Sequence, residues 1–236
     1  MNLVRSACLA VALVLSSGSV ATAQDFDKGL AAAQAGDFVT ALEELRPLAE
    51  QGVANAEYNL GVMYANGAGV LQDDAEAVKW YRLAAEQGHP MAQHGLGWSY
   101  YNGQGVPQDY SEAVTWYRMA AERGHASAQY NLGQMYRDGQ VVLQDYSETI
   151  KWYRLAAEQG LEMAQTNLGN AYASGQGVLQ DNVKAHMWYN IGAANGDALG
   201  GENRGKIADE MTPADISQAQ AMARECMSSG YSDCGW

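Results

Sequence analysis

Hydrophobic and polar positions along this chain follow a pattern that repeats every 36 residues. Four copies, residues 54–89, 90–125, 126–161 and 162–197, follow one another without a gap, and twelve positions are identical in all of them. A fixed period of roughly 20–50 residues is typical of stacked repeat proteins. The pattern therefore predicts an array of similar units in which each unit packs on its neighbours.

Each copy is predicted to fold as two helices. In the first copy, Ala56, Leu60 and Tyr64 stand at i, i+4 and i+8, which places them on one face of a helix. Gly67 is predicted to end that helix, because glycine adopts the left-handed conformation without a Cβ clash. A second helix follows the loop, and its buried face is predicted to contain Ala77, Trp80, Tyr81, Ala84 and Ala85.

An aspartate precedes each second helix. Asp73 is predicted to cap the helix N-terminus, with Glu76 three residues later completing a capping box. The same pair recurs at Asp109/Glu112 and at Asp145/Glu148. We therefore expect each of these glutamates to bond back to the backbone of the capping aspartate.

The segments on either side of the array are predicted to be atypical helix pairs that cap it. Residues 24–53 indicate a shorter pair with a tight turn, and residues 198–229 indicate a second pair followed by a tail, residues 230–236. A terminal repeat has one face without a neighbour, so a departure from the consensus is expected there.

The first 23 residues have the three parts of a secretory signal peptide. Arg5 precedes an apolar run from about residue 7 to residue 15, and Ala21-Thr22-Ala23 offers a cleavage site after Ala23. The apolar run is too short to span a membrane. We therefore predict a periplasmic protein, with secretion to the outside as the alternative.

Charge and cysteine content fit an exported protein. Without residues 1–23 the chain has 13 basic and 27 acidic residues, a net charge of −14, which does not favour nucleic acid as a partner. Cys226 and Cys234 then remain, and two cysteines near a chain end in an oxidising compartment suggest a disulfide. The alternative is two independent free thiols.

The sequence contains no recognisable catalytic motif, so no catalytic residue, cofactor or metal is expected. His89 and His125 occupy the same place in successive copies, where packing at a helix end is favoured over metal ligation. His186 is predicted to lie on the exposed side of its helix.

The consensus LGxxYxxGxGVxQDxxxAxxWYxxAAxxG resembles the Sel1-like repeat, a relative of the tetratricopeptide repeat. The resemblance implies an all-α fold, a right-handed α-solenoid of stacked antiparallel helix pairs. It also implies a monomeric, non-enzymatic scaffold or adaptor that binds a protein or an extended peptide. Envelope signalling, polysaccharide export and host interaction are the roles that such proteins commonly have.

In tetratricopeptide-like arrays the first helices line a concave face, and the resemblance assigns partner binding to that face. The outward positions most suited to binding are Tyr58, Met91, His94, Trp98, Tyr101, Tyr130, Gln134 and Arg137. Tryptophan, tyrosine and arginine dominate binding hot spots. The alternative is that Trp98 and the tyrosines fill gaps between repeats.

A second functional class is a cell-wall protein that binds or hydrolyses peptidoglycan or β-lactams. Exported Sel1-like proteins linked to β-lactams are rich in paired cysteines, with one disulfide in each repeat. This chain does not have that pattern. It also lacks a serine nucleophile paired with a lysine. The adaptor interpretation is therefore favoured.

Overall fold

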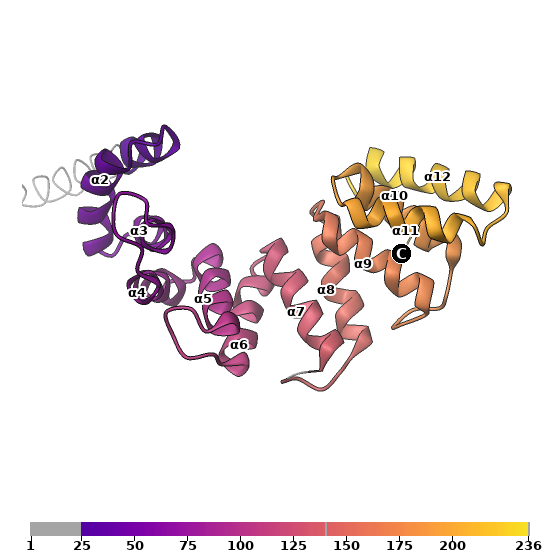
Figure 1. Cartoon of the computed structure of the whole chain (residues 1–236), viewed down its shortest axis with the longest axis horizontal. Helices are drawn as coiled ribbons and strands as arrows, with labels where there is room; N and C mark the ends of the chain where they lie inside the picture. The colour runs from indigo at the N-terminus through magenta and orange to yellow at the C-terminus, as the bar shows by residue number, and fades with distance from the viewer. Residues whose placement is uncertain (1–24, 140, 236) are drawn as a thin grey trace, which may run out of the picture. The chain divides into compact units, whose positions relative to one another are not determined.

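The computed structural model describes residues 25–139 and 141–235, and within them every regular element is a helix (Figure 1). The predicted signal peptide, residues 1–23, lies outside this part of the chain. The chain divides into two compact units, Met1–Gln108 and Asp109–Trp236. The prediction of an all-helical fold is confirmed.

The first unit is a succession of helices that pack on their neighbours in sequence. Residues 25–34 form a helix, followed by α2 (Phe38–Glu50), α3 (Ala54–Asn66), α4 (Asp74–Glu86) and α5 (Pro90–Asn102). α3 packs on both α2 and α4, and α4 packs on α5. Of the predicted face of α3, Ala56 and Leu60 are buried and Tyr64 is half-buried, while Met63 joins the core beside them.

The second unit is also a succession of packed helices and ends with a longer helix. Its helices are α6 (Tyr110–Glu122), α7 (Ala126–Asp138), α8 (Tyr146–Glu158), α9 (Glu162–Ser174), α10 (Asn182–Ala194), α11 (Ala198–Ala208) and α12 (Pro213–Ser228). α10 packs on α9, α11 and α12, and its Trp188 and Met187 are fully buried. This is the main core of the second unit.

Glycines end the first helix of every repeat, as predicted. Gly67, Gly103, Gly139 and Gly175 all have left-handed backbone conformations, with φ between +65° and +72°. A second loop glycine, seen at Gly69, Gly105 and Gly177, also has positive φ and touches the backbone at the start of the preceding repeat's second helix. These loops therefore fasten one repeat to the next.

Only the aspartate caps of the predicted capping boxes form, and the predicted return bonds from the glutamates are wrong. The Asp73, Asp109 and Asp145 carboxylates do accept hydrogen bonds from the backbone N–H three residues ahead. The carboxylates of Glu112 and Glu148, however, accept from the indole Nε1 of Trp116 and Trp152, at 3.1 and 3.0 Å. A tryptophan four residues along the same helix face is within reach of these two glutamates and offers its indole N–H as a donor. In the first copy, Glu76 accepts from Lys79 instead.

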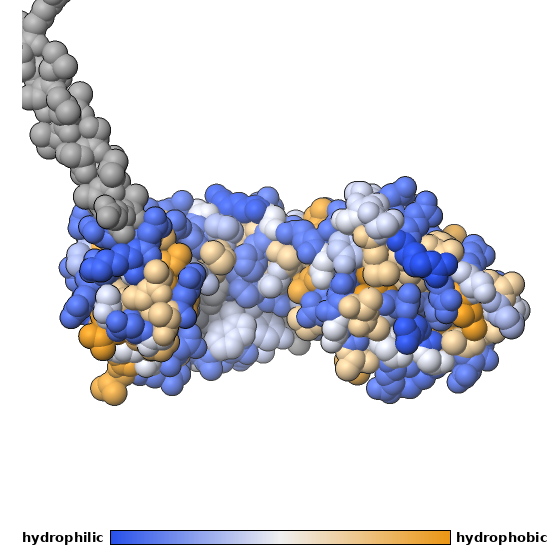
Figure 2. Space-filling model, turned by 90° about the horizontal axis from the view of Figure 1, so that it is seen from above, coloured by the Kyte–Doolittle hydropathy of each residue, from blue (hydrophilic) through white to orange (hydrophobic). Residues whose placement is uncertain are grey.

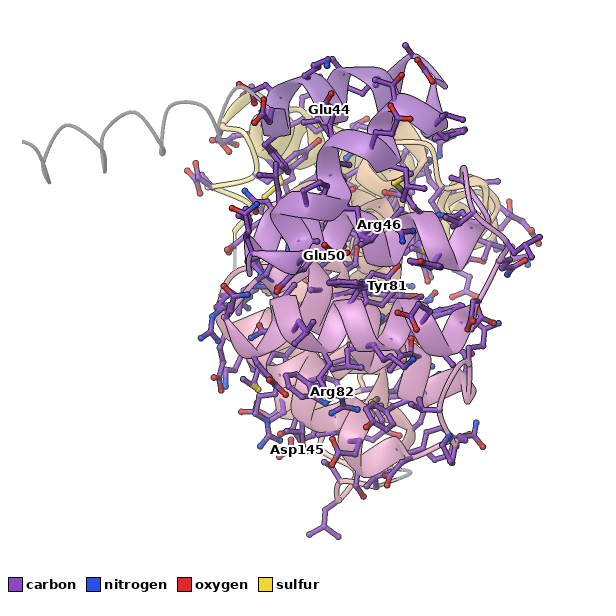
Figure 3. The ribbon with its side chains drawn as sticks, turned by 90° about the vertical axis from the view of Figure 1, so that its left-hand side faces the viewer. Glu44, Arg46, Glu50, Tyr81, Arg82 and Asp145 are labelled. Atoms are coloured by element: carbon purple, nitrogen blue, oxygen red, sulfur yellow. A yellow bond between two sulfur atoms is a disulfide. The ribbon has the colours of Figure 1, made fainter. Side chains whose placement is uncertain are left out.

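Arginine–tyrosine hydrogen bonds connect one repeat to the next at regular intervals. The guanidinium groups of Arg46, Arg82 and Arg118 donate to the hydroxyls of Tyr64, Tyr100 and Tyr136, at 3.1, 2.6 and 2.9 Å. Each bond joins a second helix to the following first helix, and Figure 3 shows Arg46 and Arg82 in successive repeats. These arginines thus stabilise the packing of each second helix on the following first helix.

His186 is buried, which corrects the prediction of a surface position. Its exposed fraction is 3%, because α10 is covered by α9, α11 and α12. The equivalent residues of the other repeats are Val78, Val114 and Ile150, which are also buried. The sequence already indicated burial at this position, because an apolar residue stands there in the other three copies.

The C-terminal helix is held at both ends. Thr212 and Asp215 form a complete capping box at its start, with Pro213 in the first turn. After its end, Cys226 and Cys234 lie at disulfide-bonding distance, with their Cα atoms 4.5 Å apart and both side chains buried. The disulfide alternative is therefore supported over two free thiols.

Candidate partner-binding groove

A groove in the first unit contains four of the predicted partner-binding residues. Its walls come from α3 and α5, its floor comes from α4, and its volume is about 490 Å³. We name it the α3–α5 groove, and the predicted residues that line it are Tyr58, Met91, His94 and Trp98. Tyr101, which was predicted with them, is half-buried and is not part of the lining.

The floor of this groove is the ring of Tyr81, which packs between two glycines. A Cβ atom on Gly61 would lie 2.7 Å from the Tyr81 ring, and one on Gly95 would lie 3.5 Å from it. Gly95 replaces the asparagine that stands at this position in the other copies. The absence of a side chain on α5 at this point leaves space above the tyrosine.

The aromatic side chains of the groove differ in how much they are already used for packing. Tyr58 stacks on the His89 ring at 4.8 Å between centroids and lies 6.0 Å from the Tyr81 ring. Trp98 and Met91, in contrast, are each 45% exposed. Tyr58 therefore agrees with the packing alternative, whereas Trp98 and Met91 have the exposure that a binding surface requires.

The lining of the groove combines neutral polar and apolar side chains with a single carboxylate. Burial raises the pKa of both Tyr58 and Tyr81, so both hydroxyls remain protonated at neutral pH. Asp74, in the first turn of α4, is the one acidic residue of the lining, which has no lysine or arginine. Asp74 was not among the predicted site residues, although its acidic side chain stands where the other copies have Tyr110, Tyr146 and Asn182.

His89 is the N-cap of α5, the helix that forms one wall of the groove. Its Nδ1 accepts a hydrogen bond from the Ala92 backbone N–H at 3.2 Å, and burial lowers the pKa of its imidazole. Because the unfolded chain binds the proton more readily, this stabilisation is complete above the unfolded pKa, about 6.5. It is lost progressively as the pH falls from there through the folded pKa.

We therefore predict that acidification from pH 7.5 to 5 destabilises the wild type more than it destabilises His89→Asn. Asparagine is a strong N-cap that does not titrate, so it keeps the acceptor at both pH values. Urea unfolding of the two proteins at each pH measures the difference, in which the contributions of all other titrating groups cancel. Equal pH dependence in both proteins would contradict the capping role.

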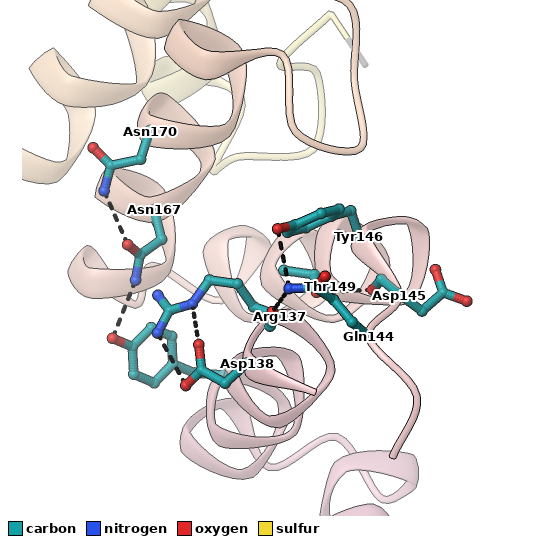
Figure 4. A network of polar contacts seen from close by, with 9 residues as sticks. Arg137, Asp138, Gln144, Asp145, Tyr146, Thr149, Asn167 and Asn170 are labelled. Carbon is teal, nitrogen blue, oxygen red and sulfur yellow. Dashed lines mark hydrogen bonds and ion pairs between the residues drawn. The ribbon is translucent and has the colours of Figure 1, made fainter. Parts of the chain in front are cut away.

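The remaining predicted residues lie in the second unit and are more heavily engaged. Tyr130 stacks on Tyr153 at 5.6 Å, and its hydroxyl accepts a hydrogen bond from the Asn167 amide at 3.1 Å. The Arg137 guanidinium donates to the Asp138 carboxylate at 2.7 Å (Figure 4). Gln134 lies on the same helix, α7, and is half-buried. Tyr130 thus contributes to packing between repeats.

Residues 25–139 and 141–235 contain no group of three or more His, Cys, Asp or Glu side chains placed to hold a metal. His125 accepts from the Ala128 N–H at 3.2 Å, so it caps a helix as His89 does.

On the face shown in Figure 2, hydrophobic side chains form small separate patches. No helix among the described residues is long and apolar enough to cross a membrane.

The family model of the Sel1 repeat matches residues 54–89, 90–125, 126–161 and 162–197, more than half of the chain. The chain belongs to the Sel1 repeat family. The predicted resemblance is confirmed, and with it the fold class, an α-solenoid of stacked helix pairs. Sel1 repeat proteins are generally protein-interaction scaffolds.

Solved structures of similar Sel1 repeat chains agree with this assignment. A protective antigen of uropathogenic Escherichia coli with an SLR fold is 41% identical, with a TM-score of 0.71 over 79% of this chain. This chain spans only 41% of that antigen. A Sel1 repeat protein from Oxalobacter formigenes is 33% identical, with a TM-score of 0.69, covering 87% of this chain and 77% of its own. A sel1 repeat protein from Klebsiella pneumoniae, 20% identical with a TM-score of 0.52 over 79% of this chain and 93% of its own, is similar in fold alone. No curated protein matches the sequence.

Proposed function

We propose that this Sel1 repeat protein is a non-enzymatic, exported adaptor that binds another protein, or an extended peptide of it, in the α3–α5 groove. The observation that carries the proposal is the exposure of Trp98 and Met91 on the rim of a groove of about 490 Å³. A large exposed aromatic side chain on the rim of a concave surface is typical of an interaction hot spot. The scaffold function general to the family supports the same conclusion.

Export of the protein is supported by two observations. Residues 1–23 have the pattern of a signal peptide, and the paired Cys226 and Cys234 are suited to an oxidising compartment. We therefore place the adaptor in the periplasm or outside the cell.

The proposal predicts that Met91→Ala combined with Trp98→Ala abolishes capture of the partner. Truncation of a hot-spot tryptophan costs about 2 kcal/mol or more of binding free energy, roughly a thirtyfold loss in affinity. Because both side chains are half-exposed, thermal unfolding of the variant should match that of the wild type. The measurement is capture from periplasmic extract on immobilised protein, with the bound proteins identified and quantified.

Two results separate the possible functions. Leu83→Ala is the control, because Leu83 is also 45% exposed but lies on α4 outside the groove, and this variant should retain the partner. Enrichment of muropeptides without a stoichiometric protein would contradict the adaptor and favour a cell-wall ligand. A collapse of folding in the double variant would show instead that Trp98 packs between repeats.

A further inference from the structure

The α3–α5 groove has an equivalent two repeats later, within the second unit. That second groove is lined by residues of α7, α8 and α9, and we name it the α7–α9 groove. All eight of its lining residues stand 72 residues after residues that line the α3–α5 groove. The two grooves can therefore be compared position by position as variants of one design.

The α7–α9 groove is much smaller because its own side chains fill it. Its volume is about 140 Å³, against about 490 Å³ for the α3–α5 groove. Arg137 stands where the first groove has Ala65, and Asn167 stands where it has Gly95. Two small residues in the α3–α5 groove thus leave open a space that a guanidinium and an amide occupy in the other.

The guanidinium of Arg137 lies in an aromatic and acidic environment. It donates to the Asp138 carboxylate at 2.7 and 3.3 Å (Figure 4). Burial raises the pKa of the Tyr130 and Tyr153 phenols, and the positive charge of Arg137 acts in the opposite direction by lowering both pKa values to a smaller extent. The chain itself therefore shows that a guanidinium fits beside this pair of tyrosines.

The α3–α5 groove has the equivalent pair of tyrosines without the cation, and Asn66 stands where Asp138 pairs with the guanidinium in the second groove. Tyr58 and Tyr81 are the equivalents of Tyr130 and Tyr153, and Trp98 adds a third ring. Asp74 replaces the phenol of Tyr146, which brings a carboxylate into the lining. The described part of the chain contains no ion pair that neutralises Asp74. The groove is therefore complementary to a positive charge.

We propose that the α3–α5 groove binds a basic side chain of the partner, an arginine or a lysine, which pairs with Asp74 and lies against the rings of Tyr58, Tyr81 and Trp98. The inference rests on the proposed function, because it specifies the chemistry of the segment that the adaptor recognises. Cations are attracted to the faces of aromatic rings, and a guanidinium pairs with a carboxylate through directed hydrogen bonds. The overall charge of −13 also attracts basic segments.

The test is selection from a random library of unstructured dodecapeptides displayed on phage, using the full chain as bait. The Ala65→Arg variant, which places in this groove the residue found at Arg137, serves for counter-selection. Enriched peptides should contain an arginine or lysine, and replacing it by glutamine should weaken binding about tenfold or more. Asp74→Asn should weaken binding of the parent peptide equally, and should change binding of the glutamine peptide little.

The outcomes distinguish this inference from the proposed function. Enriched peptides that lack a basic residue and still require Trp98 would overturn the basic-side-chain inference and leave the adaptor groove intact. If no peptide prefers the wild type over Ala65→Arg, both fail. Near-ultraviolet circular dichroism of Asp74→Asn and Ala65→Arg must match that of the wild type. If the Ala65→Arg spectrum differs, Trp98→Ala replaces it in the counter-selection.

Discussion

Replacing Gly105 by alanine is expected to lower the free energy of unfolding by about 2–4 kcal/mol. Two causes add. The backbone of Gly105 has φ of +72°, which is unfavourable for alanine, and a Cβ atom would lie 2.1 Å from the Asp74 carbonyl oxygen. Since that oxygen belongs to the preceding repeat, the loop would have to move away from the surface on which it docks.

Gly52→Ala is the matched control for Gly105→Ala. Gly52 has a similar φ of +84°, but a Cβ atom there would meet no atom within 4 Å. Its substitution should therefore show only the conformational cost, about 1 kcal/mol. Urea unfolding followed by circular dichroism measures both variants, and equal losses would contradict the docking of the loop on Asp74.

Replacing Gly169 by alanine is expected to destabilise the second unit by about 1–3 kcal/mol, the opposite of the usual effect in a helix. Within a helix, alanine is normally favoured over glycine by about 1 kcal/mol. Gly169, however, lies in α9 directly against the buried ring of Tyr189, and a Cβ atom would approach that ring to 2.5 Å. The ring or the helix would have to shift in a closely packed core.

Gly205→Ala provides the contrast in the same unit. Gly205 lies inside α11, where a Cβ atom would meet no atom within 4 Å, so this change should stabilise by up to about 1 kcal/mol. Thermal unfolding should show a lower stability for Gly169→Ala and a higher stability for Gly205→Ala. Such opposite effects would show that Gly169 is required by the tyrosine ring that packs on it. Stabilisation by both would contradict that role.

The fold could be predicted from the sequence because the repeated residues act locally. Leu60 and its equivalents fall on one helix face, and Gly67 ends the helix, so these features depend on spacing alone. The glutamates of the predicted capping boxes were wrong because neighbouring side chains, Trp116, Trp152 and Lys79, compete for them. That competition depends on three-dimensional reach. His186 was misplaced because a single helical pattern was considered without the other copies.

The groove could be predicted only in part. Trp98 and Met91 were recognised from their residue types, because exposed aromatic and sulfur-containing side chains on a helix face are conspicuous. Asp74 was missed because it lies on another helix, and Ala65 and Gly95 were missed because they contribute space. A cavity depends on which side chains are absent, and that becomes visible when the two equivalent grooves are compared.

The measurement that tests the central claim most directly is photo-crosslinking from inside the groove. A photoreactive amino acid is placed at Met91 and, as the matched control, at Met163, its equivalent in the fourth repeat with 44% exposure. We predict that Met91 yields a crosslink to one partner protein in the producing cell, that Trp98→Ala removes this crosslink, and that Met163 does not yield it. A crosslink from Met163 but not from Met91, or one that survives Trp98→Ala, would contradict the account.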